Sequence, residues 1–186
     1  VIDAACAELL EVSEGDEVYL VPQGEALRVR GIYTQNQAAS HATIGDRCAI
    51  NLAGHNLRRE NISRGNWLTS NPHHEASSRF DMLLKVLASE SKPLANWTPV
   101  HVHTAANHVT GRVAVLEDTR INPNESGLVQ VVLKEAINIC MGDRVILRDQ
   151  GAIRTIAGGT IVSPYSPLRG RARPARLELL RQCVDL

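Results

Sequence analysis

Three closely spaced histidines are the first residues in this sequence whose types could do chemistry. His101 and His103 lie at positions i and i+2, so in a β-strand both side chains point to one face, and His108 follows shortly after. Imidazole is a common zinc ligand, but no cysteine or carboxylate stands near these residues with ligand spacing. We therefore disfavour a metal site, and a small hydrolase or metal-binding β-protein built on these histidines is the weaker alternative.

Arginine is the main basic residue and the best candidate for local contacts with phosphate. The chain has only three lysines, Lys85, Lys92 and Lys134. A planar guanidinium makes bidentate contacts with phosphate, which lysine does not. The formal net charge is zero, so the bulk charge gives no argument for nucleic acid. Aromatic residues are only 3% of the chain and do not interleave with a basic strand, which disfavours recognition by base stacking.

Short β-strands must position these side chains. Residues 27–33 alternate arginine with aliphatic side chains, which predicts a strand with one wet and one dry face. Gly65 is interpreted as a bend within a further strand. Turns containing Gly, Asp or Asn separate the runs, as in a small antiparallel barrel. The strands predicted in this first half are residues 18–22, 27–33, 48–52 and 62–68.

A second set of strands follows a polar break at residues 69–78 (TSNPHHEASS). Residues 142–162 predict the closing hairpin of a second barrel, with a turn at Gly142, a polar loop containing Arg154, and a last strand at 160–162. Gly142, Gly158 and Gly159 are interpreted as turn and bend residues only. The other predicted strands are residues 80–88, 100–103, 109–116, 128–133 and 144–148, with a loop at 118–125.

The sequence therefore predicts an all-β protein of two consecutive small antiparallel barrels, residues 1–70 and 79–164. Residues 165–186 are expected to form a basic linker and the first helix of a following region, because prolines and arginines give way to leucines at helical spacing. The linker shows no carboxylate nearby in sequence, which favours RNA contact over a purely solubilising role for its arginines. These are Arg169, Arg171, Arg173 and Arg176.

Composition and motif content exclude several classes of protein. Apolar residues are 44% and charged residues 22% of the chain, which is typical of a globular protein with a buried core. The four cysteines are scattered without a CxxC pair. No apolar run reaches membrane-spanning length and no signal peptide is present. A phosphate-binding GxxxxGK[ST] loop is also absent, so a nucleotide site is expected outside these residues.

Several stretches resemble the bacterial selenocysteine-specific elongation factors, a family of translational GTPases. Residues 30–37 (RGIYTQNQ), 44–54 (IGDRCAINLAG) and 62–68 (ISRGNWL) are similar to the second domain of that family. Residues 97–103 (WTPVHVH) and 106–116 (ANHVTGRVAVL) are similar to its third domain. The 142–162 stretch resembles the end of the third domain in the wider elongation factor Tu class. The resemblance covers residues 15–162.

The resemblance implies a function. The second and third domains of such a factor hold selenocysteinyl-tRNA, which the whole protein delivers to the ribosome during UGA recoding in a GTP-dependent manner. GTP and Mg would belong to a missing N-terminal domain, so no cofactor and no GTPase activity are expected in this fragment. The mRNA selenocysteine-insertion hairpin would bind missing C-terminal domains. A cytoplasmic location without membrane contact is implied. The chain begins at Val1 without the first strand of the second domain, so we expect an imperfectly closed first barrel carrying at most half of the selenocysteine pocket.

The resemblance also assigns residues. Arg47 stands where the family has an arginine lining the selenocysteine pocket, where a guanidinium would favour an ionised selenol over serine. Asn61 and Arg64 correspond to positions that hold the 3′ end of the tRNA in the wider class, although Asn61 replaces a carboxylate there. Contacts with the tRNA backbone are assigned to His101, His103, Arg112 and Arg154, which would recognise an A-form duplex by shape and phosphate.

Alternatives stay open at this point. Arg148 and Arg154 flank the last loop, and we favour a structural role for both, with Arg148 paired to Asp143 or Asp149. Barrel domains of a general translational elongation or initiation factor are the main alternative to the selenocysteine-specific family. Arg47 and the strand with two histidines favour the specific family over the general one.

Overall fold

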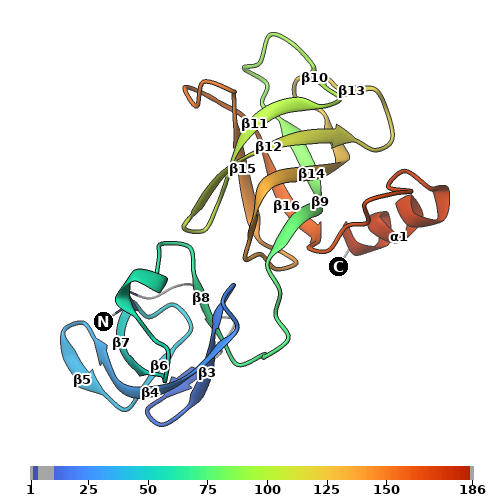
Figure 1. The fold of residues 1–186 in the computed structure, drawn as a ribbon. Coiled ribbons are helices and arrows are strands. Elements are labelled where there is room, and N and C mark those ends of the chain that lie inside the picture. Colours follow the sequence, from blue (N-terminus) through green and yellow to red (C-terminus); the bar gives the residue numbers. More distant parts are fainter. Residues whose placement is uncertain (1, 4–10, 185–186) are drawn as a thin grey trace. The chain divides into compact units, whose positions relative to one another are not determined.

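The computed structural model describes residues 2–3 and 11–184 of the chain, which divides into two compact units, Val1–Ala76 and Ser77–Leu186. Apart from one short 3-10 helix and one C-terminal α-helix, the regular elements described are all β-strands (Figure 1). The prediction of an all-β protein followed by the start of a helix is confirmed.

The first unit consists of two small antiparallel sheets around one core. The larger sheet has the order β1-β7-β4-β3-β8, with β5 paired to β4, and the smaller joins β2 to β6. These described strands do not close into a complete hydrogen-bonded barrel. The elements are β1 (Ile2–Asp3), β2 (Glu11–Ser13), β3 (Glu17–Val21), β4 (Glu25–Thr34), β5 (Gln37–Ala39), β6 (His41–Thr43), β7 (Cys48–Ala53), η1 (Arg59–Asn61) and β8 (Trp67–Thr69).

Strand β4 shows how the sequence pattern forms this core. Leu27 and Val29 are buried while Arg28 and Arg30 are exposed, as the alternation predicts. The pairing with β7 shifts by one residue between Val29 and Gly31, and this bulge turns the next aliphatic side chain, Ile32, back into the core.

The predicted strand at residues 62–68 is wrong except at its end. A 3-10 turn at η1 precedes it, and β8 begins only at Trp67. Between them the Asn66 side chain accepts hydrogen bonds from the backbone amide of Ser63 at 2.6 Å and from its hydroxyl at 3.2 Å. Gly65 has φ +94° in this turn, so local side-chain bonding outcompetes the sheet ladder here.

The second unit is a closed antiparallel barrel with the strand order β11-β12-β14-β9-β16-β15. The hairpin of β15 and β16 joins β11 to β9, so the prediction that it closes a barrel is confirmed. The remaining strands, β10 and β13, form a separate pair. The elements are β9 (Ser77–Val86), β10 (Leu94–Ala95), β11 (Thr98–Thr104), β12 (Asn107–Val115), β13 (Arg120–Ile121), β14 (Ser126–Ile137), β15 (Arg144–Arg148), β16 (Thr155–Ser163) and α1 (Pro174–Val184).

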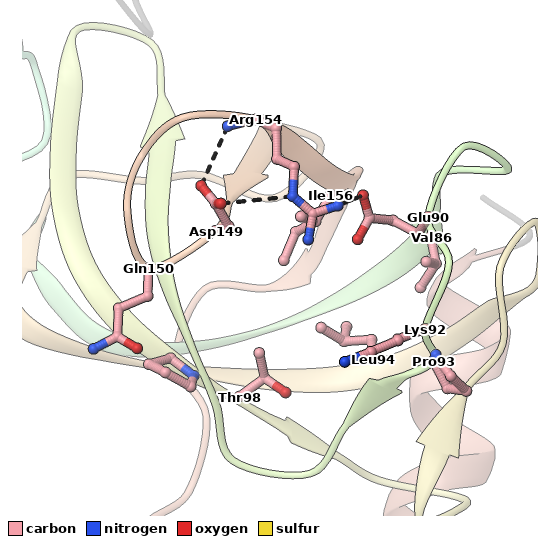
Figure 2. A pocket seen from close by; sticks show the side chains of 11 residues that line it. Val86, Glu90, Lys92, Pro93, Leu94, Thr98, Asp149, Gln150, Arg154 and Ile156 are labelled. Atoms are coloured by element: carbon pink, nitrogen blue, oxygen red, sulfur yellow. Dashed lines mark hydrogen bonds and ion pairs between the residues drawn. The ribbon is translucent and has the colours of Figure 1, made fainter.

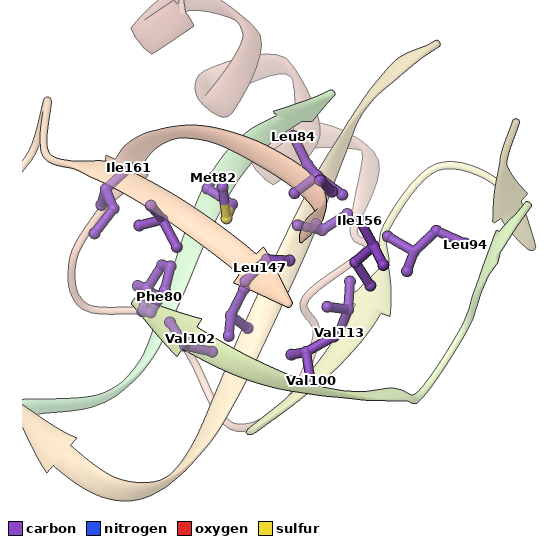
Figure 3. Packing of buried hydrophobic residues seen from close by; sticks show 14 of the residues in the cluster. Phe80, Met82, Leu84, Leu94, Val100, Val102, Val113, Leu147, Ile156 and Ile161 are labelled. Carbon is purple, nitrogen blue, oxygen red and sulfur yellow. The ribbon is translucent and has the colours of Figure 1, made fainter. Parts of the chain in front are cut away.

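Aliphatic side chains fill the barrel interior. Alternate residues of every strand point inward, among them Met82, Val102 and Leu147, which are fully buried (Figure 3). Phe80 is the only phenylalanine of the chain and is also fully buried. The interior is therefore built from branched side chains that suit a pleated surface rather than from aromatic rings.

Gly158 and Gly159 are not turn residues, contrary to the prediction. Both lie inside β16, where Gly158 pairs with Ile146 and Gly159 with Val145. A Cβ atom on Gly159 would collide with the carbonyl oxygen of Leu83 on the neighbouring strand. The glycine is needed because two backbones approach closely there, which is a tertiary constraint.

The C-terminal segment, residues 164–184, lies on the outer wall of the barrel. The Asp81 carboxylate, which has no solvent-exposed surface, forms an ion pair with Arg176. Gln130, next to Asp81 across the strand pair, donates to the carbonyl of Pro167 at 3.3 Å. Leu180 of α1 packs with aliphatic side chains of the barrel wall: Leu116, Leu128 and Val162. This segment is therefore a docked part of the second unit.

Candidate nucleic-acid interface

The outer face of strands β11 and β12 carries a row of polar side chains. Val100 and Val102 point into the barrel, so His101 and His103, which alternate with them along the strand, point outward, as their spacing predicts. The antiparallel register places His103 opposite His108 and His101 opposite Thr110. On the other side of β11, Arg148 of β15 lies opposite His101. Side chains from three strands therefore share one exposed face.

The three histidines form one stack of imidazole rings. The ring of His108 lies between the other two, with centroids 4.5 Å from His103 and 5.2 Å from His101. A hydrogen bond of 3.1 Å joins His101 Nδ1 to His108 Nε2, and His101 Nε2 lies 3.2 Å from the carbonyl oxygen of Gln150. In the part of the chain that the structure describes, no three His, Cys, Asp or Glu residues are placed to hold a metal ion.

Burial and neighbouring cations act on His103. Loss of hydration lowers the pKa of His103 below its ordinary value, and the positive charges of His108, Arg148 and His101 lower it further. Its Nε2 atom is buried and has no hydrogen-bond partner among the residues that the structure describes. A proton on His103 is therefore disfavoured until a negative charge comes near.

A cleft of about 550 Å³ adjoins the stack. His101 lines it from β11, Arg112 from β12 and Lys134 from β14. Gly111 forms part of its floor, and a Cβ atom there would lie 2.7 Å from the carbonyl oxygen of Val132, so only glycine allows β12 and β14 to approach closely here. The cleft thus gathers one imidazole and two full positive charges around a surface open to an anionic partner.

Arg154 lines a second, smaller cleft of about 280 Å³, shown in Figure 2. Its guanidinium donates to Glu90 at 2.5 Å and lies 3.6 Å from Asp149. Asp149 also accepts the backbone amides of Ile153 and Arg154, and these bonds with the nearby guanidinium groups lower the pKa of this carboxyl. Because two carboxylates neutralise the charge of Arg154, its main role is to stabilise the loop.

Arg148 plays a structural role by a different contact from the predicted one. Its Nη2 atom donates to the carbonyl oxygen of Ile153 at 3.0 Å, which ties the two ends of the loop together. The ion pair with Asp149 that was expected for Arg148 is made by Arg154 instead.

Arg47 lies on the surface of the first unit, immediately before β7. The preceding turn is fixed by Asp46, whose carboxylate accepts the amide of Thr43 at 2.9 Å and its hydroxyl at 3.1 Å. These bonds lower the pKa of Asp46, and Gly45 has φ +92°. Arg47 is exposed and forms no ion pair with any described residue. Its guanidinium is therefore available to an outside partner.

Asn61 and Arg64 lie near each other in sequence but on different elements. Asn61 ends the 3-10 turn, and its carbonyl accepts a hydrogen bond from the Gln23 side chain at 2.9 Å. Arg64 follows in the turn before β8, and both side chains are exposed. The structure therefore leaves both side chains accessible to solvent.

Two arginines of the basic segment already contact other side chains of the second unit. The sequence predicted instead a linker whose arginines have no carboxylate nearby. Arg176 is paired with Asp81, and the guanidinium of Arg171 lies 4.8 Å from the ring centre of Trp97. Sequence inspection missed Asp81 because it is distant along the chain. It also missed Lys134 as a cleft residue, because only the pairing of β12 with β14 brings that strand alongside.

No helix in the described part of the chain is long and apolar enough to cross a membrane.

Comparison with known proteins places this geometry in a family. Residues 81–168 match the family described as the beta-barrel domain of the selenocysteine-specific elongation factor. Over 170 residues the chain is 36% identical to the selenocysteine-specific elongation factor of Escherichia coli (strain K12), which covers 91% of this chain and 26% of that protein. The chain thus spans about a quarter of the length of this relative.

Two solved structures share the fold. The apo form of translation elongation factor SelB from Methanococcus maripaludis matches with a TM-score of 0.75 at 21% identity, covering 87% of this chain and 38% of that one. A bacterial selenocysteine-specific elongation factor, EF-Sec, matches with a TM-score of 0.72 at 22% identity, covering 92% and 27%. At these identities the similarity concerns the fold alone.

Proposed function

The chain belongs to the family of selenocysteine-specific elongation factors, and from this premise we propose that its two units are the part that holds selenocysteinyl-tRNA. The whole factor would deliver this tRNA to the ribosome, in the cytoplasm, in a GTP-dependent manner during UGA recoding. We assign GTP and Mg binding to another segment of such a factor, because these residues contain no phosphate-binding loop. Binding of the mRNA hairpin is likewise proposed for other segments.

The observation that carries the proposal is the cationic cleft of the second unit. Arg112 and Lys134 line it together with His101, and neither Arg112 nor Lys134 forms an ion pair within the described residues. Phosphate contacts supply most of the affinity of a protein for a nucleic-acid backbone and set its position. An A-form duplex recognised by shape needs such a face rather than aromatic residues. Arg154 contributes less, because Glu90 and Asp149 already hold it.

The first unit would supply the discrimination between amino acids. A selenol is more acidic than a hydroxyl, and the unpaired guanidinium of Arg47 stabilises its anion by a charge-assisted hydrogen bond that serine cannot match. Asn61 and Arg64, both exposed nearby in sequence, are proposed to contact the 3′ end of the tRNA.

A binding titration tests both parts of the proposal. The chain is titrated with reduced selenocysteinyl-tRNA and with seryl-tRNA at two salt concentrations. Arg47→Ala should lower the preference for selenocysteinyl-tRNA by about tenfold, the lower end of what a hydrogen bond to a charged group contributes. Arg112→Ala should weaken the binding of both tRNAs by the same factor. It should also reduce the slope of log affinity against log salt concentration by about 1.

Arg30→Ala provides the matched control, since it removes another exposed arginine of the first unit. It should change neither the preference for selenocysteinyl-tRNA nor the salt dependence of binding. Equal affinity for the two tRNAs in the unmodified chain would favour a general translation factor. Absence of salt-dependent binding to either tRNA would contradict the proposal as a whole.

A further inference from the structure

The contacts within the imidazole stack restrict where protons can sit in the free protein. The bond between His101 Nδ1 and His108 Nε2 needs one nitrogen with a hydrogen and one without, so these two rings are not both fully protonated while it persists. His103 stacks on His108 at 4.5 Å, and a second charge there is opposed by burial and by its neighbours.

The charges facing the stack are mostly positive. On β11 and β12 these are the three histidines themselves, and Arg112 lies further along β12 in the adjoining cleft. From β15 the stack faces Arg148, and from β14 Lys134 lines the same cleft. In the loop after β15, Asp149 is the closest carboxylate in sequence to the Gln150 carbonyl that His101 contacts, and its charge is engaged by Arg154. An anion arriving from solution therefore meets a site where the positive groups named here outnumber the one nearby carboxylate, Asp149, which Arg154 already engages.

We propose that His101, His103 and His108 form a proton-linked contact for an RNA phosphate, so that RNA binding by the second unit takes up a proton from solvent. This inference rests on the proposed function and specifies how the same face is regulated. The Nε2 atom of His103 is buried and does not itself face a phosphate in solution. Protonation of one of the three rings would add a positive charge and one N–H donor to the face that a phosphate oxygen approaches.

The sign of the effect follows from linkage. A phosphate near the rings stabilises the imidazolium form and raises its pKa relative to the free protein. The bound state then holds more protons than the free state between the two pKa values, so affinity rises as the pH falls through this interval and levels off outside it. One proton taken up completely corresponds to a tenfold gain in affinity per pH unit at most, about 1.4 kcal/mol.

The experiment uses the whole chain and uncharged selenocysteine tRNA as the probe, at constant ionic strength between pH 6 and pH 8. Affinity of the unmodified protein should rise by about threefold or more on going from pH 8 to pH 6, given partial uptake of one proton. The triple variant His101→Asn, His103→Asn, His108→Asn should lose this dependence, whereas His73→Asn, which changes an exposed histidine in the first unit, should keep it.

A second measurement needs no variant. Ring resonances of the three histidines are followed against pH by NMR with and without tRNA, and their titration should move to higher pH when RNA is bound. Identical titrations in both samples, or an unchanged pH dependence in the triple variant, would overturn the proposal. RNA binding that is independent of pH contradicts this inference alone, whereas no binding at any pH contradicts the proposed function.

Discussion

Replacing Arg176 by glutamine should release the C-terminal segment from the barrel. The Arg176 guanidinium is the only ionic partner of Asp81 among the described residues, and Asp81 has no exposed surface. The other contact of this carboxylate is a long hydrogen bond of 3.5 Å from the amide of Gln130. In the variant, Asp81 either stays buried without a counter-charge or gains water when the segment lifts.

The size of the effect follows from these two options. Removing one partner of a buried ion pair destabilises a protein by about 3–5 kcal/mol when the other charge stays sealed from water. Arg176 is 17% exposed and the segment that covers Asp81 lies at the surface. When this segment lifts, water reaches Asp81, and this hydration limits the loss of stability. We expect a loss of about 2–3 kcal/mol, which lowers the Tm of this unit by roughly 10 °C.

Fluorine NMR of the chain labelled with 5-fluorotryptophan measures this effect for each unit. The chain has two tryptophans, Trp67 in the first unit and Trp97 in the second. Because Arg171 of the segment lies over the Trp97 ring, the Trp97 resonance should also shift in the folded variant. The Trp67 resonance should keep its position and its melting temperature.

Arg181→Gln is the matched control on the same helix. Arg181 also forms an ion pair, with Glu117 at 2.5 Å, but its side chain is 55% exposed and water screens the pair, so its loss should cost much less stability than the loss of Arg176. The double variant Asp81→Leu, Arg176→Met should recover most of the stability, since it removes both charges. Equal melting temperatures of the second unit in the Arg176→Gln and Arg181→Gln variants would refute the idea that the buried ion pair with Asp81 holds the segment.

Three further predictions concern the second unit. Gly159→Ala should prevent closure of the barrel, because the new Cβ atom would collide with the backbone of Leu83. The amide NMR spectrum of the variant should lose the dispersed β resonances of this unit. The equally small change Gly151→Ala, in the exposed loop, should retain them. Leu180→Ala should destabilise the docked helix by about 2 kcal/mol, measured by urea unfolding, because the side chain is only 3% exposed. Asp149→Asn should lower the Tm at pH 7, and the difference from the unmodified protein should begin to shrink below about pH 4, the ordinary pKa of Asp, and vanish as the pH falls through the lower pKa of Asp149 in the folded protein. The lowered pKa of Asp149 contributes stability only while the carboxyl is ionised; a difference that persists at acidic pH would contradict this.

Part of the candidate site could be predicted from local pattern. The spacing of His101 and His103 requires a shared face in any strand, and the structure has that arrangement. The stack with His108 and the cleft with Lys134 depend on the register of β12 and on the pairing of β14, which the spacing of residues does not contain. The same limit explains the wrong expectation for Arg176, whose carboxylate partner lies on β9.

The sequence by itself determined the all-β class, the alternation of β4 and the closing hairpin, because side-chain period and turn chemistry act between neighbours in the chain. Only the tertiary structure decided that Gly159 must be glycine, that the C-terminal segment is docked, and that Arg112 and Lys134 line one cleft with His101. These features depend on close packing and on charges brought together from distant strands, and such forces act through space rather than along the chain.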